Sequence, residues 1–203
     1  TGSQPDLPAA CLAVGDVDAG AIARERGFHV PNALEGLDQP NVRSVDQVLL
    51  DPPDAGTSIL VIDAQGHWEA AGTAERLADL GCRVTVVTSR PQVGFGMEAT
   101  NRVMFHQRAR EKGIALVPNV RVAAIEAAGV RMVDQLTREQ LRPTDVDVVV
   151  PVYPRVSRDD LYFQLADAIG DRDDIRVERI GDASVPRMIQ TILLESHQLA
   201  MQL

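Results

Sequence analysis

Residues 58–88 read SILVIDAQGHWEAAGTAERLADLGCRVTVVT, and this stretch decides the fold class. Residues 58–63 form a short apolar run of strand length, and the apolar positions from Trp68 onward recur at spacings of three and four, which indicates an amphipathic helix. Gly81 is a natural helix terminator, and residues 83–88 are rich in β-branched side chains, which favours a second strand. Strand, helix and strand within about thirty residues predict a βαβ unit and a parallel sheet.

The chain after this unit continues the α/β pattern. Residues 98–112 have helical composition and lead to a third apolar run at 114–117. Residues 120–126 and 130–134 predict a hairpin packed beside or across the sheet. Residues 145–152 predict another buried strand.

The C-terminal residues predict two helices and a last strand. Apolar positions between Leu161 and Ile169 predict one helix, residues 175–180 predict the strand, and Pro186 is expected to open the terminal helix. Residues 1–57 carry prolines and glycines every few positions, which favours short strands, turns and one brief helix near 19–26. We do not expect that stretch to form a domain by itself.

Composition excludes several classes of protein. The 203 residues include 29 acidic and 20 basic side chains, and the net charge of −9 offers no surface for wrapping nucleic acid. No apolar run approaches the roughly 18 residues that a membrane helix needs. Cys11 and Cys82 lie far apart without a CxxC motif or neighbouring histidines, so we expect no zinc site and reduced thiols in a cytoplasmic protein.

The turn after the first strand is the first candidate site. A dinucleotide-binding turn requires GxGxxG, because its glycines allow the tight turn, the approach of the pyrophosphate and close helix packing. This chain has Gln65, His67 and Ala70 in that frame, with Gly66 one position out of register. Glu69 falls in the first helical turn, where a carboxylate competes with an incoming phosphate.

Two interpretations of this turn stay open. In the first, the βαβ unit is a scaffold without nucleotide; in the second, it binds NAD(P)H, and Arg90 after the second strand accepts a 2′-phosphate. No acid stands at 88–90 to hold a ribose hydroxyl. We expect His67 to be an oriented turn residue or the lining of a redox interface rather than a metal ligand.

The second candidate site lies between the last predicted strand and the terminal helix. Gly181 allows a ligand to approach the backbone, Asp182 can accept a hydrogen bond from a sugar hydroxyl, and the helix N-terminus offers N–H groups to phosphate. Pro186 and Arg187 follow in the same stretch. The alternative is that Asp182 is simply the N-cap of the helix.

Three segments carry a family resemblance: 59–94, VYPRVSRDDLY at 152–162 and IGDASVPRMIQTILLESHQLA at 180–200. Together they resemble the C-terminal part of the Old Yellow Enzyme-related NADH:flavin oxidoreductases, the family of trimethylamine dehydrogenase, histamine dehydrogenase and 2,4-dienoyl-CoA reductase. The resemblance covers about residues 56–203. Residues 1–5 resemble the ATG-x-x-P segment that leads into the inserted domain of these proteins.

The resemblance implies an α/β fold in which a Rossmann-like, NAD(P)-binding-type domain at 57–150 is inserted into a truncated FAD/ADP-binding-type domain formed by 1–56 and 151–203. The family places an FMN-bearing TIM barrel and a [4Fe–4S] cluster before this region, so the resemblance implies that the chain is a fragment.

The resemblance also assigns cofactor-binding residues. Gly181 and Asp182 match the Gly-Asp motif that approaches FAD, or the ADP that replaces it, and Pro186 and Arg187 match the turn that follows. Val185 stands where the family usually has alanine. Gly66, His67 and Trp68 match a Gly-His-aromatic turn typical of the family.

The resemblance implies a nucleotide-binding part of a flavin-dependent oxidoreductase, which assists electron transfer between NAD(P)H or an amine substrate and flavin. No residue of the chain stands out as a catalytic acid, base or nucleophile, so we expect it to be inactive alone. Its expected partner is the missing barrel domain or subunit. Whether the chain also forms a homo-oligomer is left open. The rival readings are a structural or subunit-contact module without nucleotide and a self-sufficient NADP-binding domain that uses Arg90.

Overall fold

The structure, a computed structural model, describes residues 34–127, 129–142, 145–170, 172, 174–187 and 189–202. It divides into two compact units, with the boundary between Tyr153 and Pro154, and each unit is described by itself. The predictions for residues 1–33, Cys11 among them, lie outside the described residues.

The first unit is built on a parallel sheet, as the βαβ pattern predicts. Its strands occur in the order β3-β2-β1-β7, and every neighbouring pair is parallel. Their bounds are β1 Ser58–Asp63, β2 Arg83–Val87, β3 Ala115–Val117 and β7 Val148–Val152. Helix α3 (Trp68–Asp79) connects β1 to β2, and helix α4 (Ala99–Glu111) connects β2 to β3. The predicted α/β class is therefore confirmed.

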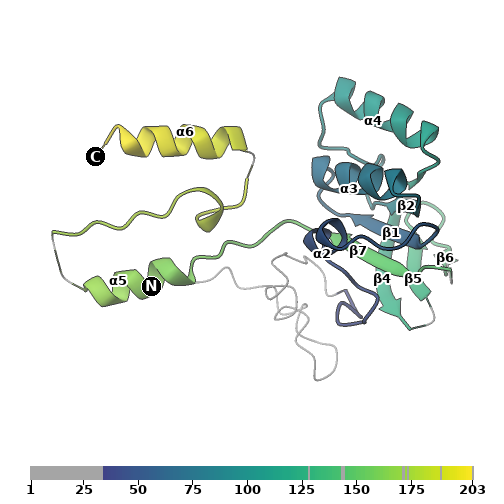
Figure 1. Ribbon diagram of the computed structural model, residues 1–203, viewed down its shortest axis with the longest axis horizontal. Helices are drawn as coiled ribbons and strands as arrows, with labels where there is room; N and C mark the ends of the chain where they lie inside the picture. The colour runs from purple at the N-terminus through teal and green to yellow at the C-terminus, as the bar shows by residue number, and fades with distance from the viewer. Residues whose placement is uncertain are drawn as a thin grey trace. The chain divides into compact units, whose positions relative to one another are not determined.

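Alternation along β1 separates two apolar cores. Ile59 and Val61 pack in the cluster that contains the buried residues of α3 and α4. Leu60 and Ile62 point to the other face and join the cluster formed with the second sheet. Because successive side chains of a strand point to opposite faces, one uniformly apolar strand supports both layers. The helices and the second sheet lie on opposite sides of the parallel sheet in Figure 1.

The second sheet is antiparallel and has three strands in the order β4-β5-β6. Strand β4 (Val120–Glu126) and strand β5 (Gly129–Asp134) form the predicted hairpin. The short β6 (Gln140–Leu141) pairs with β5 and is not anticipated by the sequence pattern, since it is too short to show alternation.

Residues 34–56 belong to the first unit and contribute to both of its apolar cores. Helix α2 (Val45–Leu50) begins with a capping box in which Ser44 and Gln47 satisfy each other's backbone N–H groups, and it buries Val45 and Val48. Upstream, Ile125 donates its N–H to the Glu35 carbonyl at 2.8 Å. The proposed sharing of one domain by residues 1–56 and 151–203 stays a prediction.

The second unit contains two helices and one short turn of 3-10 helix. Helix α5 is Asp160–Ile169, the 3-10 helix η2 is Gly181–Ala183, and helix α6 is Ile189–Ala200. The strand predicted at 175–180 is wrong, because these residues pair with no strand among the described residues and a strand exists only through such pairing. Helix α6 begins at Ile189 rather than at Pro186.

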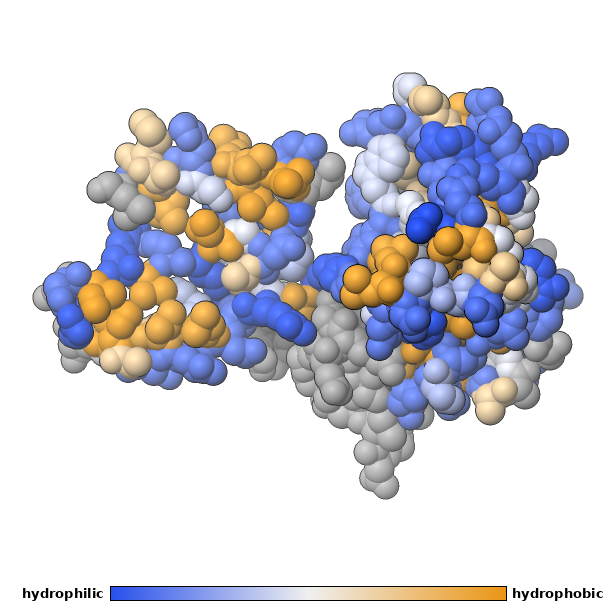
Figure 2. All heavy atoms as spheres, viewed as in Figure 1, coloured by the Kyte–Doolittle hydropathy of each residue, from blue (hydrophilic) through white to orange (hydrophobic). Residues whose placement is uncertain are grey.

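Apolar side chains of the second unit are largely exposed. Among its described residues only Gly181 is buried. The exposed fractions reach 66% both for Leu161 on α5 and for Ile189 on α6. Figure 2 shows apolar surface along both helices. The amphipathic pattern that predicts each helix therefore does not lead to a buried core within the described residues of this unit.

None of the described helices combines the length and apolar character needed to cross a bilayer.

Candidate nucleotide site

The carboxyl ends of the parallel strands form the part of the first unit where a ligand is expected. Strand β1 lies between β2 and β7, so the chain continues from β1 to β2 on one side, while β7 flanks β1 on the other. In open α/β sheets, ligands bind at this kind of switch point, beyond the carboxyl ends of the strands. The residues that follow β1, β2 and β7 therefore make up the candidate site.

Asp63 ends β1 and is the central polar group of this edge, with only 1% of its surface exposed. Its Oδ1 accepts the N–H of Gly66 at 2.6 Å, and its Oδ2 accepts the N–H of Gly94 at 3.1 Å. The hydroxyl of Thr88 donates to the Asp63 carbonyl at 2.7 Å. One buried aspartate thus connects the turn after β1 to the loop after β2.

Burial raises the pKa of the Asp63 carboxyl above its usual 3.8, because desolvation disfavours the charged form. The N–H bonds from Gly94 and Gly66 act in the opposite direction, as do the charges of Arg90 and His67. Both carboxylate oxygens accept N–H groups, so these bonds suit the ionised form.

The sequence-predicted residues Gly66, His67 and Arg90 come together at this turn. Gly66 has φ +76°, and a Cβ there would lie 3.1 Å from both Cδ and Nε of Arg90. His67 is the N-cap of α3 but makes no side-chain capping bond. Its ring packs on Gly96 instead, where an added Cβ would lie 2.5 Å from Nε2.

The loop at 89–98 covers this turn and was missed by reasoning from the sequence. Gly96 donates its N–H to the Gly66 carbonyl at 2.8 Å. Two residues of the loop, Val93 and Met97, are buried in the core that includes α3 and α4, and His106 Nε2 lies 2.9 Å from the Val93 carbonyl oxygen. The signal available in the sequence was the GFG at 94–96, which permits close approach of two backbones.

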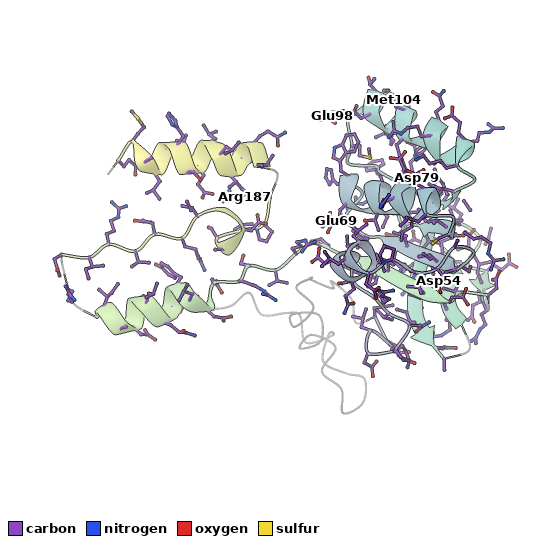
Figure 3. All side chains as sticks on the ribbon, in the orientation of Figure 1. Asp54, Glu69, Asp79, Glu98, Met104 and Arg187 are labelled. Carbon is purple, nitrogen blue, oxygen red and sulfur yellow. The ribbon has the colours of Figure 1, made fainter. Side chains whose placement is uncertain are left out.

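The edge between β1 and β7 is bridged by further hydrogen bonds. Ala64 donates its N–H to the Val152 carbonyl at 3.0 Å, and Gln65 Nε2 donates to the Tyr153 carbonyl at 3.0 Å. Burial raises the pKa of the Tyr153 phenol to about 12. Glu69 lies in the first turn of α3, as expected (Figure 3). The carboxyl edge of β1 is thus bonded to the chain that follows β7.

The second candidate site belongs to the second unit. Gly181 has φ +64°, and its carbonyl accepts the N–H groups of Ser184 at 2.9 Å and Val185 at 3.1 Å. Asp182 is exposed on this turn. Because α6 begins only at Ile189, Asp182 is not its N-cap, and that alternative is wrong.

Arg187 reaches from this turn to α6, where its Nη2 lies 2.9 Å and 2.8 Å from the two carboxylate oxygens of Glu195 (Figure 3). Its Nε donates to the Val185 carbonyl at 3.2 Å. The structure places Gly181, Asp182, Pro186 and Arg187 along one turn. The bonds to Glu195 and Val185 use Nη2 and Nε of Arg187.

Across the ranges described above, no three histidine, cysteine, aspartate or glutamate side chains gather to form a metal site.

Comparisons with known proteins agree with this architecture. The family model for pyridine nucleotide-disulphide oxidoreductases matches residues 68–140. Among solved structures, the chain is similar to 6-hydroxypseudooxynicotine amine oxidase from Pseudomonas geniculata N1, with 30% identity over 80% of this chain and a TM-score of 0.72. Histamine dehydrogenase from Rhizobium sp. 4-9 has 26% identity over 80% of this chain and a TM-score of 0.74.

A structure of 2-naphthoyl-CoA reductase shares the fold, with 23% identity over 80% of this chain, 23% of that chain covered and a TM-score of 0.66. No curated protein matches the chain. The chain spans about a quarter of the amine oxidase and of the histamine dehydrogenase, 24% and 26% of their lengths. The matches show a Rossmann-like nucleotide-binding fold and support the resemblance to flavin oxidoreductases.

Proposed function

We propose that the chain is the nucleotide-binding part of a longer flavin-dependent oxidoreductase. In this proposal it holds FAD or ADP at the turn from Gly181 to Arg187 and assists electron transfer between NAD(P)H or an amine substrate and flavin. The observation that carries the proposal is the similarity to the amine oxidase and the histamine dehydrogenase over 80% of the chain.

The described residues of the second unit support a role in binding. The positive φ of Gly181 turns the backbone sharply, and the exposed carboxylate of Asp182 can accept a hydrogen bond from a ribose or ribityl hydroxyl. Arg187 is held before α6 by Glu195, and a guanidinium suits a pyrophosphate because its N–H groups match two oxygens at once. Pro186 and its neighbours would supply backbone contacts.

The proposal assigns the chemistry to other parts of the protein. FMN and a [4Fe–4S] cluster would belong to the polypeptide that precedes this chain, as a barrel domain or a separate subunit. The exposed apolar side chains of α5 and α6 support such a partner, since monomeric proteins rarely leave large apolar patches uncovered. A cytoplasmic location and the possibility of a homo-oligomer belong to the same proposal.

Binding of NAD(P)H at Gly66, His67 and Arg90 is a second candidate function. It is favoured by the position of Arg90, which lies over the Gly66 turn and is exposed. A structural or subunit-contact module without nucleotide is the rival, and the internally bonded edge around Asp63 favours it.

Calorimetric titration separates these functions. The chain, and the product of the longest open reading frame that contains it, would each be titrated with ADP, FAD, NADH and NADPH. Asp182→Ala and Arg187→Ala should each weaken ADP or FAD binding by about tenfold or more, the loss of one good hydrogen bond or ion pair. Asp174→Ala and Arg172→Ala are matched controls, because these two exposed residues pair with each other in the same unit.

Binding of ADP or FAD that depends on Asp182 and Arg187 supports the proposal. Tight NADPH binding that depends on Arg90 supports the second candidate function. Absence of heat with all four nucleotides, in both proteins, supports the structural module and contradicts the proposal.

A further inference from the structure

The turn after β1 does not fit a bound pyridine nucleotide, and Asp63 is the reason. In nucleotide-binding folds, N–H groups of the strand-to-helix turn point at the pyrophosphate. Here the N–H of Gly66 points at Asp63 Oδ1 at 2.6 Å. One N–H group of this turn therefore already binds a carboxylate of the chain instead of a phosphate.

The second hydrogen bond of the Asp63 carboxylate joins it to a loop that is distant in sequence. An aspartate often accepts an N–H from a residue shortly after it in sequence, and the Gly66 bond alone would have that explanation. The Gly94 N–H, however, comes from a residue 31 positions away and lies 3.1 Å from Oδ2. The Asp63 carboxylate therefore occupies a point where backbone N–H groups of two loops converge, as they do around a bound anion.

The loop after β2 is fixed across the same point. The N–H of Gly96 donates to the Gly66 carbonyl, and Arg102 Nη1 donates to the carbonyls of Phe95 and Met97, both at 3.1 Å. A pyrophosphate entering here would have to displace this loop. It would also approach a buried carboxylate, and like charges repel strongly where water is excluded.

We propose that the Asp63 carboxylate takes the place of the nucleotide phosphate, so that the domain keeps a dinucleotide-binding fold while excluding pyridine nucleotides. Asp63 is thus the residue that determines specificity at this turn. This inference does not depend on FAD or ADP binding in the second unit, and it excludes the second candidate function given above.

Rescue by a small anion tests the proposal. Asp63→Gly removes the carboxylate and leaves the two N–H groups facing an empty anion position of formate size. Thermal unfolding of the full 203-residue chain would be followed in sodium formate and in sodium chloride of equal ionic strength. Asp63→Asn is the comparison variant, because its amide still fills the position, and Asp54→Gly is the matched exposed control.

We expect formate, but not chloride, to raise the melting temperature of Asp63→Gly in a saturable way, since a ligand that binds only the folded state stabilises it. Wild type, Asp63→Asn and Asp54→Gly should respond to formate as they do to chloride. An Asp63→Gly chain that does not respond to formate, or stays unfolded in it, overturns the proposal.

A nucleotide titration of the unaltered chain provides an independent test. Trp68, the only tryptophan of the chain, is the first residue of α3 and reports on the turn. We expect NADPH and NADH to leave its fluorescence unchanged after correction for absorbance. Saturable quenching of Trp68 by either nucleotide overturns the proposal, whatever ADP or FAD do at the second unit.

Discussion

Asp63 and Gly94 are joined by a hydrogen bond of 3.1 Å between a buried carboxylate oxygen and a backbone N–H. This bond connects the end of β1 to the loop after β2 at the edge of the sheet where a nucleotide would bind. Because the carboxylate is 1% exposed, its loss cannot be compensated by water without opening the loop. Stability and specificity of the first unit therefore depend on the same side chain.

Asp63→Asn should lower the free energy of unfolding by about 1–3 kcal/mol at neutral pH. The amide oxygen can still accept one N–H group, but the amide nitrogen then faces the other N–H and makes no bond. Urea unfolding followed by circular dichroism measures the change. Stability equal to that of wild type would show that the two bonds of Asp63 contribute nothing.

The same substitution should change the pH dependence of stability. Since burial raises the pKa of Asp63 above 3.8, the folded state holds this proton more tightly than the unfolded state does. The contribution of this group to stability is therefore largest at low pH. It falls as pH rises from about 3.8 through the folded-state pKa, then stays level. The free energy of unfolding of wild type minus that of Asp63→Asn should follow this decline, and an increase over that range would contradict it.

Gly36→Ala should be among the most damaging substitutions in the described chain. Gly36 has φ +84°, and an added Cβ would lie 1.9 Å from the Ile125 carbonyl oxygen on β4. A backbone atom cannot yield as a side chain can, so we expect a loss above about 3 kcal/mol. Gly56→Ala is the control, because φ is +87° there but nothing lies within 4 Å; it should cost about 1–2 kcal/mol. Equal losses would mean that residues 34–37 do not pack on β4.

Gly96→Ala tests the contact between the loop and His67. The new methyl group would lie 2.5 Å from His67 Nε2, and the imidazole can move away by rotating its side chain. We expect a cost of about 0.5–1.5 kcal/mol and a shift of the His67 ring resonances by NMR. Gly72→Ala, in α3 with nothing within 4 Å, should instead stabilise by about 0.5–1 kcal/mol. Unchanged His67 resonances would contradict the contact.

Leucine truncation should distinguish the two units. Leu77 on α3 has 0% of its surface exposed, so Leu77→Ala should cost about 2–5 kcal/mol. Leu193 on α6 is 62% exposed, and Leu193→Ala should change the free energy of unfolding of this chain by less than about 0.5 kcal/mol. Urea unfolding and hydrogen exchange measure both. A large loss for Leu193→Ala would show that α6 is covered in the chain itself.

The pattern of apolar and polar residues over short stretches of sequence was enough to predict the parallel sheet. The apolar runs of β1 and β2 and the helical spacing between them are properties of adjacent residues, and a βαβ unit follows from their order. The hairpin of β4 and β5 was predictable for the same reason. The pattern also brought Gly66, His67 and Arg90 to one edge, because the ends of parallel strands meet there.

Other features could not be predicted in this way. Residues 175–178 alternate like a strand, but a strand needs a neighbour, and none pairs with residues 175–180 among the described residues. The packing of α2 and of Leu34 and Leu37 on the first unit depends on contacts with strands far along the chain. In the sequence, α2 is marked by little more than its capping box.

The sequence by itself determined that this protein has a Rossmann-like α/β domain and that its dinucleotide turn lacks the usual glycines. Only the tertiary structure decided what replaces them. An aspartate at the end of β1 can face solvent, cap its own turn or contact a ligand. The sequence is the same in all three cases, so it does not distinguish them. Its role depends on a backbone N–H from Gly94, which folding brings within hydrogen-bond distance and removes from water.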